Sequence, residues 1–224
     1  MSTNSCDYVP PHQIREIRPT RRSVSGQFAF RGRVMVPFES TLERDFLLRA
    51  EFFENVTEVI AQPVEVSFTN PDARSYTYTP DYLVYRRDAC PELVEVKPAA
   101  QWRQHARAWF PKWKAARRHA KARGWTFRLH DESRIRDRAL ENIRFLQRYG
   151  RIHFPEDAAL ARLVAAVASV GVRRLDDVLA AETDADERRR TTARLWHLVA
   201  VRRLDCDVTG VLGGATELRV TDDG

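Results

Sequence analysis

Two short segments decide the predicted fold, TPD at residues 79–81 and LVEVK at residues 93–97. Both have the composition of strand ends, and the turn-forming sequence RDACP at 87–91 separates them. Because side chains alternate along a strand, Glu95 and Lys97 lie on one face, and the two valines of LVEVK lie on the apolar face. Antiparallel pairing through the turn places the aspartate of TPD near Glu95 and Lys97, in a register that the sequence leaves open to within a residue.

Outward from these segments, the pattern predicts an α/β core with a mixed sheet flanked by helices. Strand-like runs precede and include the two segments, and the amphipathic helix that follows leads into another strand. A strand–helix–strand sequence implies a right-handed crossover and a parallel strand pair. The expected strands cover 59–68, 75–85, 92–97 and 125–130, and the expected helices cover 40–55, 101–123 (kinked at Pro111 or divided there into two segments) and 134–149.

Three regions divide the chain in this prediction. Residues 1–36 are polar and rich in arginine and proline, which predicts a basic N-terminal arm with little regular structure. Residues 37–150 form the α/β core. Residues 151–224 contain three helical runs and a glycine-rich β-hairpin pattern, which favours a small helical, winged-helix-like C-terminal domain.

The charge balance is basic, with a net charge of +6 and a sequence pI near 9.5. Such a balance suits a polyanionic partner such as DNA, although an arginine-rich composition also follows from a GC-rich genome. Lysines are few: Lys97, Lys112, Lys114 and Lys121. Because lysine is rare in this chain, Lys97 is less readily explained as a random surface charge than an arginine would be.

The cysteines and the hydropathy indicate a cytoplasmic protein without membrane contact. Cys6, Cys90 and Cys206 are scattered and form no CxxC or zinc-spaced cluster. The first residues lack the apolar stretch of a signal peptide, and no run of 18 apolar residues occurs.

An acid–base set of this kind suits phosphodiester hydrolysis. The carboxylates of Asp81 and Glu95 can hold one or two Mg²⁺ ions, for which Mn²⁺ can substitute, because hard cations choose oxygen ligands. The metal stabilises charge in the transition state and lowers the pKa of a bound water. Lys97 can orient or deprotonate that water, and we expect the metal and low solvation to depress its pKa.

Each of these residues also has a structural alternative. Glu95 and Lys97 can form an ordinary salt bridge on a half-exposed strand, and Asp81 can be a polar residue at a strand start. Glu43 follows Ser40 in a capping-box pattern and can serve only as a helix cap. A tryptophan stripe on the helix at 101–123 is predicted to be core, and its basic face to be either solvated or phosphate-binding.

The order of these motifs resembles the PD-(D/E)xK nuclease superfamily, and within it the TnsA family of transposon-end endonucleases. The similarity covers about residues 30–150. The strings that carry it are ESTLERDF at 39–46, QP at 62–63, YTPDYL at 78–83 and EVKP at 95–98, followed by shorter matches between 127 and 143.

This resemblance implies a function. Members of the TnsA family cut the 5′ strands at transposon ends with Mg²⁺, beside a transposase that cuts the 3′ strands and an AAA+ ATPase regulator. By the same resemblance Glu43, Asp81 and Glu95 are metal-binding carboxylates, Lys97 is the catalytic base or water-orienting residue, and Gln62 is a possible contact of the site. Some members have Gln where this chain has Glu95.

Two alternatives remain open at this point. The chain can be another PD-(D/E)xK nuclease, such as a restriction or repair enzyme. It can also be a non-catalytic DNA-binding assembly subunit built on a decayed nuclease fold.

Overall fold

A computed structural model describes residues 12–14, 24–70, 72–155 and 157–221. The chain divides into two compact units, Met1–Ile135 and Arg136–Gly224, which are described separately below. No helix in the described ranges is long and apolar enough to cross a membrane.

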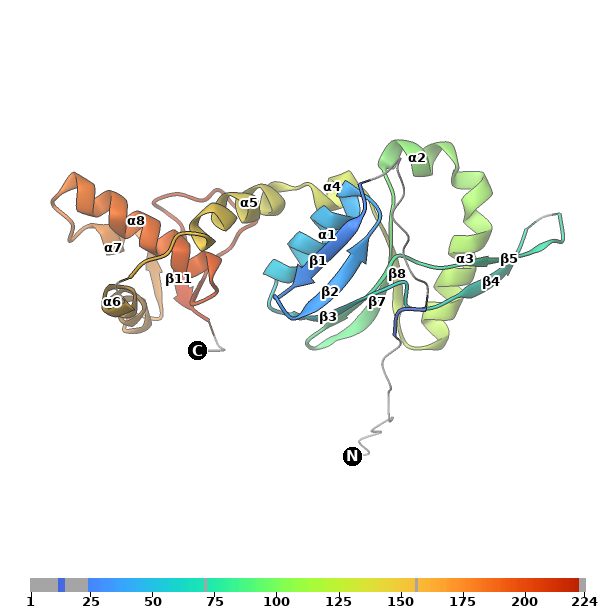
Figure 1. Ribbon diagram of the computed structural model, residues 1–224, viewed down its shortest axis with the longest axis horizontal. Coiled ribbons are helices and arrows are strands. Elements are labelled where there is room, and N and C mark those ends of the chain that lie inside the picture. Colours follow the sequence, from blue (N-terminus) through green and yellow to red (C-terminus); the bar gives the residue numbers. More distant parts are fainter. Residues whose placement is uncertain (1–11, 15–23, 71, 156, 222–224) are drawn as a thin grey trace, which may run out of the picture. The chain divides into compact units, whose positions relative to one another are not determined.

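The first unit is built on a four-stranded mixed sheet in the order β3-β6-β7-β8 (Figure 1). The strands are β3 (Val56–Ala61), β6 (Tyr82–Arg86), β7 (Ala89–Val96) and β8 (Thr126–His130). Antiparallel pairs join β3 to β6 and β6 to β7, whereas β7 and β8 run parallel. The mixed sheet and the parallel crossover pair that the sequence predicts are both present.

Both faces of this sheet are buried. Helix α1 (Thr41–Phe52) packs on one face with the hairpin of β1 (Gly26–Phe30) and β2 (Val34–Phe38). Val94 and Val96 of β7 lie in this core, as the strand alternation requires.

The opposite face is covered by helix α3 (Ala106–Ala122) and by a separate hairpin of β4 (Val66–Thr69) and β5 (Ser75–Tyr78). Leu93 of β7 is buried here, in contact range of the alanine stripe of α3. The sheet therefore lies between two helical layers (Figure 1).

The hairpin β1–β2 corrects the prediction of little regular structure over residues 1–36. Phe30, Val36 and Phe38 are buried in the α1 core, so this segment belongs to the folded unit. The prediction relied on the high arginine content of the segment and overlooked the short alternating runs QFAF and VMVPF, which are typical of strands. Residues 1–11 and 15–23 of the predicted arm lie outside the described residues.

Two predicted helices are each divided in the structure. The helix expected at 101–123 is α2 (Ala99–Gln104) followed by α3, and the break falls at His105 instead of Pro111. The helix expected at 134–149 is α4 (Glu132–Ile135) followed by α5 (Arg138–Gly150). The side chain of Asp137 caps α5 by accepting a hydrogen bond from the Leu140 amide at 3.1 Å, which explains the second break.

The second unit contains α5 and every element that follows it. Its remaining elements are α6 (Asp157–Ala168), β9 (Val172–Arg174), α7 (Leu175–Leu179), α8 (Ala185–Ala200), β10 (Leu204–Asp205) and β11 (Glu217–Val220), with a sheet order β10-β11-β9.

Helix α5 belongs to this unit because it packs on α8. Its Asn142 also donates hydrogen bonds to the carbonyls of Val208 and Gly210, at 2.8 and 2.7 Å. The sequence analysis had placed this helix with the core at 37–150. The three later helices and the pair β10–β11 follow the predicted order, whereas β9 was not predicted, and the winged-helix assignment stays a prediction.

Candidate active site

Asp81 lies at the point where the chain enters the central sheet. Pro80 separates β5 from β6, so the chain leaves the β4–β5 hairpin and begins β6 directly after Asp81. Tyr82 pairs with Val94, and the Val96 amide donates to Asp81 Oδ2 at 2.7 Å. This hydrogen bond fixes the register that the sequence left open and places Asp81 beside the end of β7.

Lys97 connects the two acidic residues of the predicted set. Its Nζ lies 3.3 Å from Asp81 Oδ2 and 3.5 Å from Glu95 Oε1. The Lys97 amide also donates to the His130 carbonyl at 3.0 Å, which extends the β7–β8 ladder by one residue. The structure therefore brings Asp81, Glu95 and Lys97 together at one end of the sheet, while their catalytic roles stay predictions.

Glu95 is held on both of its oxygens. The Tyr78 hydroxyl donates to Oε2 at 2.5 Å, and Lys112 Nζ lies 3.3 Å from Oε1 beside Lys97. The side chain is only 1% exposed. The simple alternative of a salt bridge on a half-exposed strand therefore does not describe Glu95.

Lys112 is a residue of this site that the sequence analysis placed only on the basic face of its helix. Its Nζ lies 4.6 Å from the ring centroids of both Tyr78 and Trp109, a cation–π distance. Trp109 and Trp113 were predicted to be core but are half-buried and flank the lysine. The rarity of lysine and its position between two tryptophans were the available signals.

Glu43 both caps helix α1 and lies near the acidic cluster. Ser40 is the N-cap and accepts from the Glu43 amide at 3.1 Å. The Glu43 carboxylate accepts from the Ser40 hydroxyl at 2.9 Å and from the Glu39 amide at 2.8 Å, a variant of the capping box. The Tyr82 hydroxyl, which is buried in the sheet, also lies 3.3 Å from Glu43 Oε2.

Two carboxylates of the site have raised pKa values, first because they are buried and then because Asp81 is near. Burial, followed by the charge of Asp81, raises the pKa of Glu43 to about 7. The same two causes in the same order raise the pKa of Glu95 to about 7, against the opposing effect of Lys97 and Lys112.

The pKa of Lys97 departs from the sequence expectation. Burial lowers it, as expected, but the charges of Asp81, Glu95 and Glu43 outweigh burial and raise the pKa above its ordinary value. Without a metal ion, Lys97 is therefore a stable cation that neutralises the carboxylates. The predicted depression of its pKa is wrong for this state of the protein.

Gln62 contacts the site through its backbone. Its amide donates to the Asp81 carbonyl at 2.8 Å, and it adopts a left-handed backbone with φ of 46°. Its side chain is buried, and Oε1 has no hydrogen-bond partner among the described residues. A buried amide oxygen of this kind is costly without a partner, but the structure gives it no contact with the carboxylates.

The carboxylate oxygens of Asp81 and Glu95 are of the kind that hard divalent cations prefer as ligands. Asp81 and Glu95 share the Lys97 ammonium, so a cation is already favoured between them. Within the described ranges, no three His, Cys, Asp or Glu side chains are gathered closely enough to form a metal-binding group. An ion bound by Asp81 and Glu95 would take over charge neutralisation from Lys97 and Lys112.

These features define a class of fold and site. A mixed sheet carries an aspartate where one strand begins and Glu-x-Lys where the next one ends, as in the core of PD-(D/E)xK nucleases. Residues 53–132 match the family model described as TnsA-like endonuclease N terminal. The match includes Gln62, Asp81, Glu95 and Lys97, and it confirms the resemblance to TnsA-type nucleases; Glu43 lies before it. No curated protein matches the chain.

Proposed function

We propose that this chain is a Mg²⁺-dependent DNA endonuclease that cuts the 5′ strands at transposon ends during cut-and-paste transposition. The observation that carries the proposal is the cluster of Asp81, Glu95 and Lys97 within a segment that matches a TnsA-like endonuclease domain. The match supports a nuclease role in transposition. The metal, the choice of strand and the partners belong to the proposal.

Each residue of the cluster has a definite part in this chemistry. Asp81 and Glu95, with Glu43 as a further carboxylate, would hold Mg²⁺, which when bound stabilises phosphate charge and acidifies a water molecule. Tyr78 and Lys112 hold the Glu95 carboxylate in one orientation.

Lys97 orients the attacking water and receives its proton if the amine becomes neutral. That neutral form requires the negative charge around the amine to be compensated, because the carboxylates now keep it protonated.

The proposed partners follow from the same assignment. We expect a transposase that cuts the 3′ strands and an AAA+ ATPase to act with this chain, and both should be encoded beside it. If the transposase reads the end sequence, the isolated chain should bind DNA weakly, with a steep salt dependence and little sequence preference. Tight, sequence-selective binding of a short duplex by the isolated chain would contradict this division of labour.

One alternative has a specific observation in its favour. Both oxygens of Glu95 already have partners, and this is also what a decayed nuclease core, kept for DNA binding or assembly, would contain. Intact Asp81, Glu95 and Lys97 favour the enzyme. Another superfamily nuclease would cut DNA without transposon ends and without a partner transposase.

A strand-specific nicking assay tests the proposal. Transposon-end DNA labelled on either strand is incubated with the full chain, Mg²⁺, and the transposase and ATPase encoded beside it. We expect a nick in the 5′ strand that disappears in Asp81→Ala and persists in the control Asp72→Ala, which removes an exposed carboxylate outside the site. Calorimetry with Mn²⁺ should show the same contrast, and equal affinity in Asp81→Ala would refute the metal assignment.

A further inference from the structure

A pocket lined by basic side chains lies on the opposite face of the sheet from Glu95. Its volume is about 280 Å³, part of it open to solvent, and it lies between α1 and the sheet. Four basic side chains line it, Arg49 from α1, Arg86 from β6, His130 from β8 and Arg134 from α4. All of these elements belong to the first unit.

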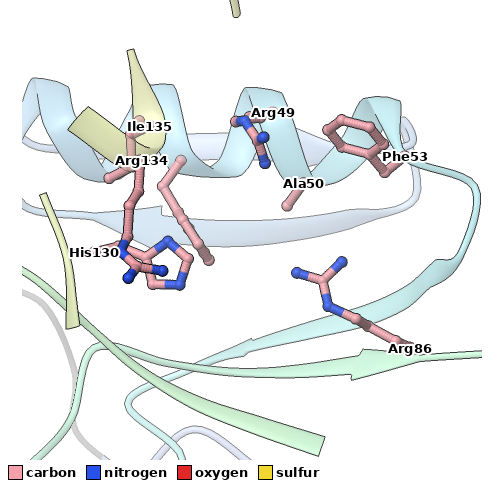
Figure 2. A pocket seen from close by; sticks show the side chains of 8 residues that line it. Arg49, Ala50, Phe53, Arg86, His130, Arg134 and Ile135 are labelled. Carbon is pink, nitrogen blue, oxygen red and sulfur yellow. The ribbon is translucent and has the colours of Figure 1, made fainter. Parts of the chain in front are cut away.

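The basic groups converge on the same space. Figure 2 shows the guanidinium groups of Arg49 and Arg86 reaching into the pocket from opposite sides, with His130 and Arg134 lying beside one another at its other end. The remaining walls are apolar, with Phe46 behind the His130 ring at a centroid distance of 5.4 Å. A small, partly apolar hollow with several convergent donors is the usual form of a specific anion site.

Glu92 is a carboxylate that pairs with two members of this group, Arg86 and His130. Glu92 lies 3.5 Å from Arg86 Nη2, 3.2 Å from His130 Nε2 and 3.6 Å from Arg128 Nε. Burial raises the pKa of Glu92, but the hydrogen bond and charge of His130, with the two arginines, lower it overall. Glu92 is therefore an anion shared by two arginines and His130, and three guanidinium groups with one imidazole converge on the pocket beside it.

Arg134 adds positive charge to this group. Its side chain is exposed and has no ion pair with any residue that the structure describes. Arg49 lies over the Phe53 ring at 4.9 Å, and its guanidinium group extends into the same hollow (Figure 2). Like charges converging on one hollow repel each other, and a bound anion relieves that repulsion.

We propose that this pocket binds a phosphate group. Guanidinium forks match phosphate oxygens in pairs, and three of them with an imidazole provide donors on several sides of one tetrahedral anion. The hollow is narrow, which suits a single phosphate more than a whole nucleotide. The phosphate comes either from the backbone of bound DNA or from a free phosphate ion.

The pocket is independent of the cluster of Asp81, Glu95 and Lys97. Val94 and Val96 separate the two, since they fill the α1 face while Glu95 points to the α3 face. Phosphate binding therefore does not rest on the proposed nuclease function. A chain that binds phosphate here but never nicks DNA would contradict only the nuclease, and the reverse result would contradict only the pocket.

Titration calorimetry of the full chain with inorganic phosphate, together with duplex-DNA binding at several salt concentrations, tests the proposal. Arg134→Gln and Arg49→Gln should each weaken phosphate binding roughly tenfold, because each removes a charge-assisted hydrogen bond. Arg117→Gln, an exposed arginine of α3 outside the pocket, is the matched control and should bind as the wild type does. Thermal melts confirm that each variant is folded, and Arg134→Gln is the safer variant because its side chain is exposed.

The DNA measurements distinguish the two sources of the phosphate. If DNA supplies it, Arg134→Gln lowers duplex affinity and reduces the salt slope by about one, and phosphate competes with the duplex. If free phosphate is the ligand, the duplex affinity and slope of Arg134→Gln equal those of Arg117→Gln while phosphate binding still falls. The proposal is overturned if neither ligand distinguishes the pocket variants from wild type.

Discussion

Glu92 and Glu95 lie three residues apart on the same strand, yet their surroundings have opposite effects on them. Glu95 faces α3, and burial with the charge of Asp81 raises its pKa to about 7. Glu92 faces α1, where burial raises its pKa but His130, Arg86 and Arg128 lower it below its ordinary value. Both have lysine, arginine or histidine partners, so the presence of a cation does not explain the difference.

The difference arises first from burial, because the Glu95 side chain is 1% exposed and that of Glu92 is 12% exposed, and then from the charges around each carboxylate. Around Glu95, the carboxylate of Asp81 accompanies Lys97 and Lys112, Glu43 adds its charge near Lys97, and a further cation is favourable. Around Glu92, the basic residues outnumber the carboxylate, and a further anion is favourable. The two faces of one sheet thus suit ligands of opposite charge, and this contrast predicts how variants on each face should behave.

The largest expected effect concerns Lys97, the cation of the acidic face. Lys97→Ala should remove 5′-strand nicking, a loss of roughly 100-fold or more, because a general base is lost. Lys97→Arg keeps the charge but does not deprotonate at accessible pH, so it should fail equally. Nicking rates with the partner transposase check this. A wild-type rate in Lys97→Arg excludes the base role, and a wild-type rate in Lys97→Ala as well excludes this site as the nuclease centre.

A smaller effect is expected at Glu43, where cap and site functions can be separated. Gln at this position keeps one oxygen to accept from the Glu39 amide, and its NH2 group can donate to the Ser40 hydroxyl, so Glu43→Gln should keep the thermal stability of the wild type. If Glu43 also belongs to the metal site, nicking should fall roughly 10- to 100-fold. Full nicking activity with unchanged stability would show that Glu43 is only a helix cap.

On the basic face, the replacement of Glu92 should change stability instead of catalysis. Glu92→Gln leaves Arg86, Arg128 and His130 without their shared anion, and should cost about 1 to 3 kcal/mol of the free energy of unfolding. Nicking should remain, and phosphate should bind more tightly because the pocket becomes more positive. Chemical denaturation, with the exposed Glu58→Gln as control, measures the cost. Loss of nicking at wild-type stability would break the proposed separation of the two faces.

The smallest effect is a pH-dependent change in stability in Asp81→Asn. The folded pKa values of Glu43 and Glu95, about 7, lie above their ordinary value of 4.5, so the folded state binds more protons than the unfolded state between these pH values. Their penalty on stability is absent below about pH 4.5, grows as the pH rises, and is complete above pH 7.

Removal of the Asp81 charge should reduce that penalty. In buffer with a metal chelator, the stability of Asp81→Asn relative to wild type should therefore increase from pH 4.5 to pH 8, by up to about 1.4 kcal/mol for each pKa unit recovered, beside a constant loss of the Asp81–Lys97 ion pair. Near pH 4.5 only the constant loss should remain. Melting temperatures measured across this range check the trend, and a difference independent of pH would contradict it.

Much of the nuclease-like unit could be predicted because its signals are local. Strand alternation placed Glu95 and Lys97 on one face and the valines on the other, and the structure has this arrangement. The turn before β7 required antiparallel pairing with β6, which brought Asp81 to the same end. By contrast, β1 and β2 were missed because the prediction relied on the high arginine content of the segment.

The sequence by itself determined the antiparallel pairing of β6 with β7, the shared face of Glu95 and Lys97, and the family resemblance, because these depend on residues close together in the chain; it did not show that the strands expected at 59–68 and 75–85 each divide in two, with β4 and β5 in a separate sheet. Only the tertiary structure decided that Lys112 of α3 contacts Glu95, that carboxylates outweigh burial at Lys97, and that α5 packs with the second unit. It alone also gathered the basic pocket from four separate elements. The charge around a site and its burial depend on all residues that lie near it in space. Those residues come together only when the helices pack on the sheet.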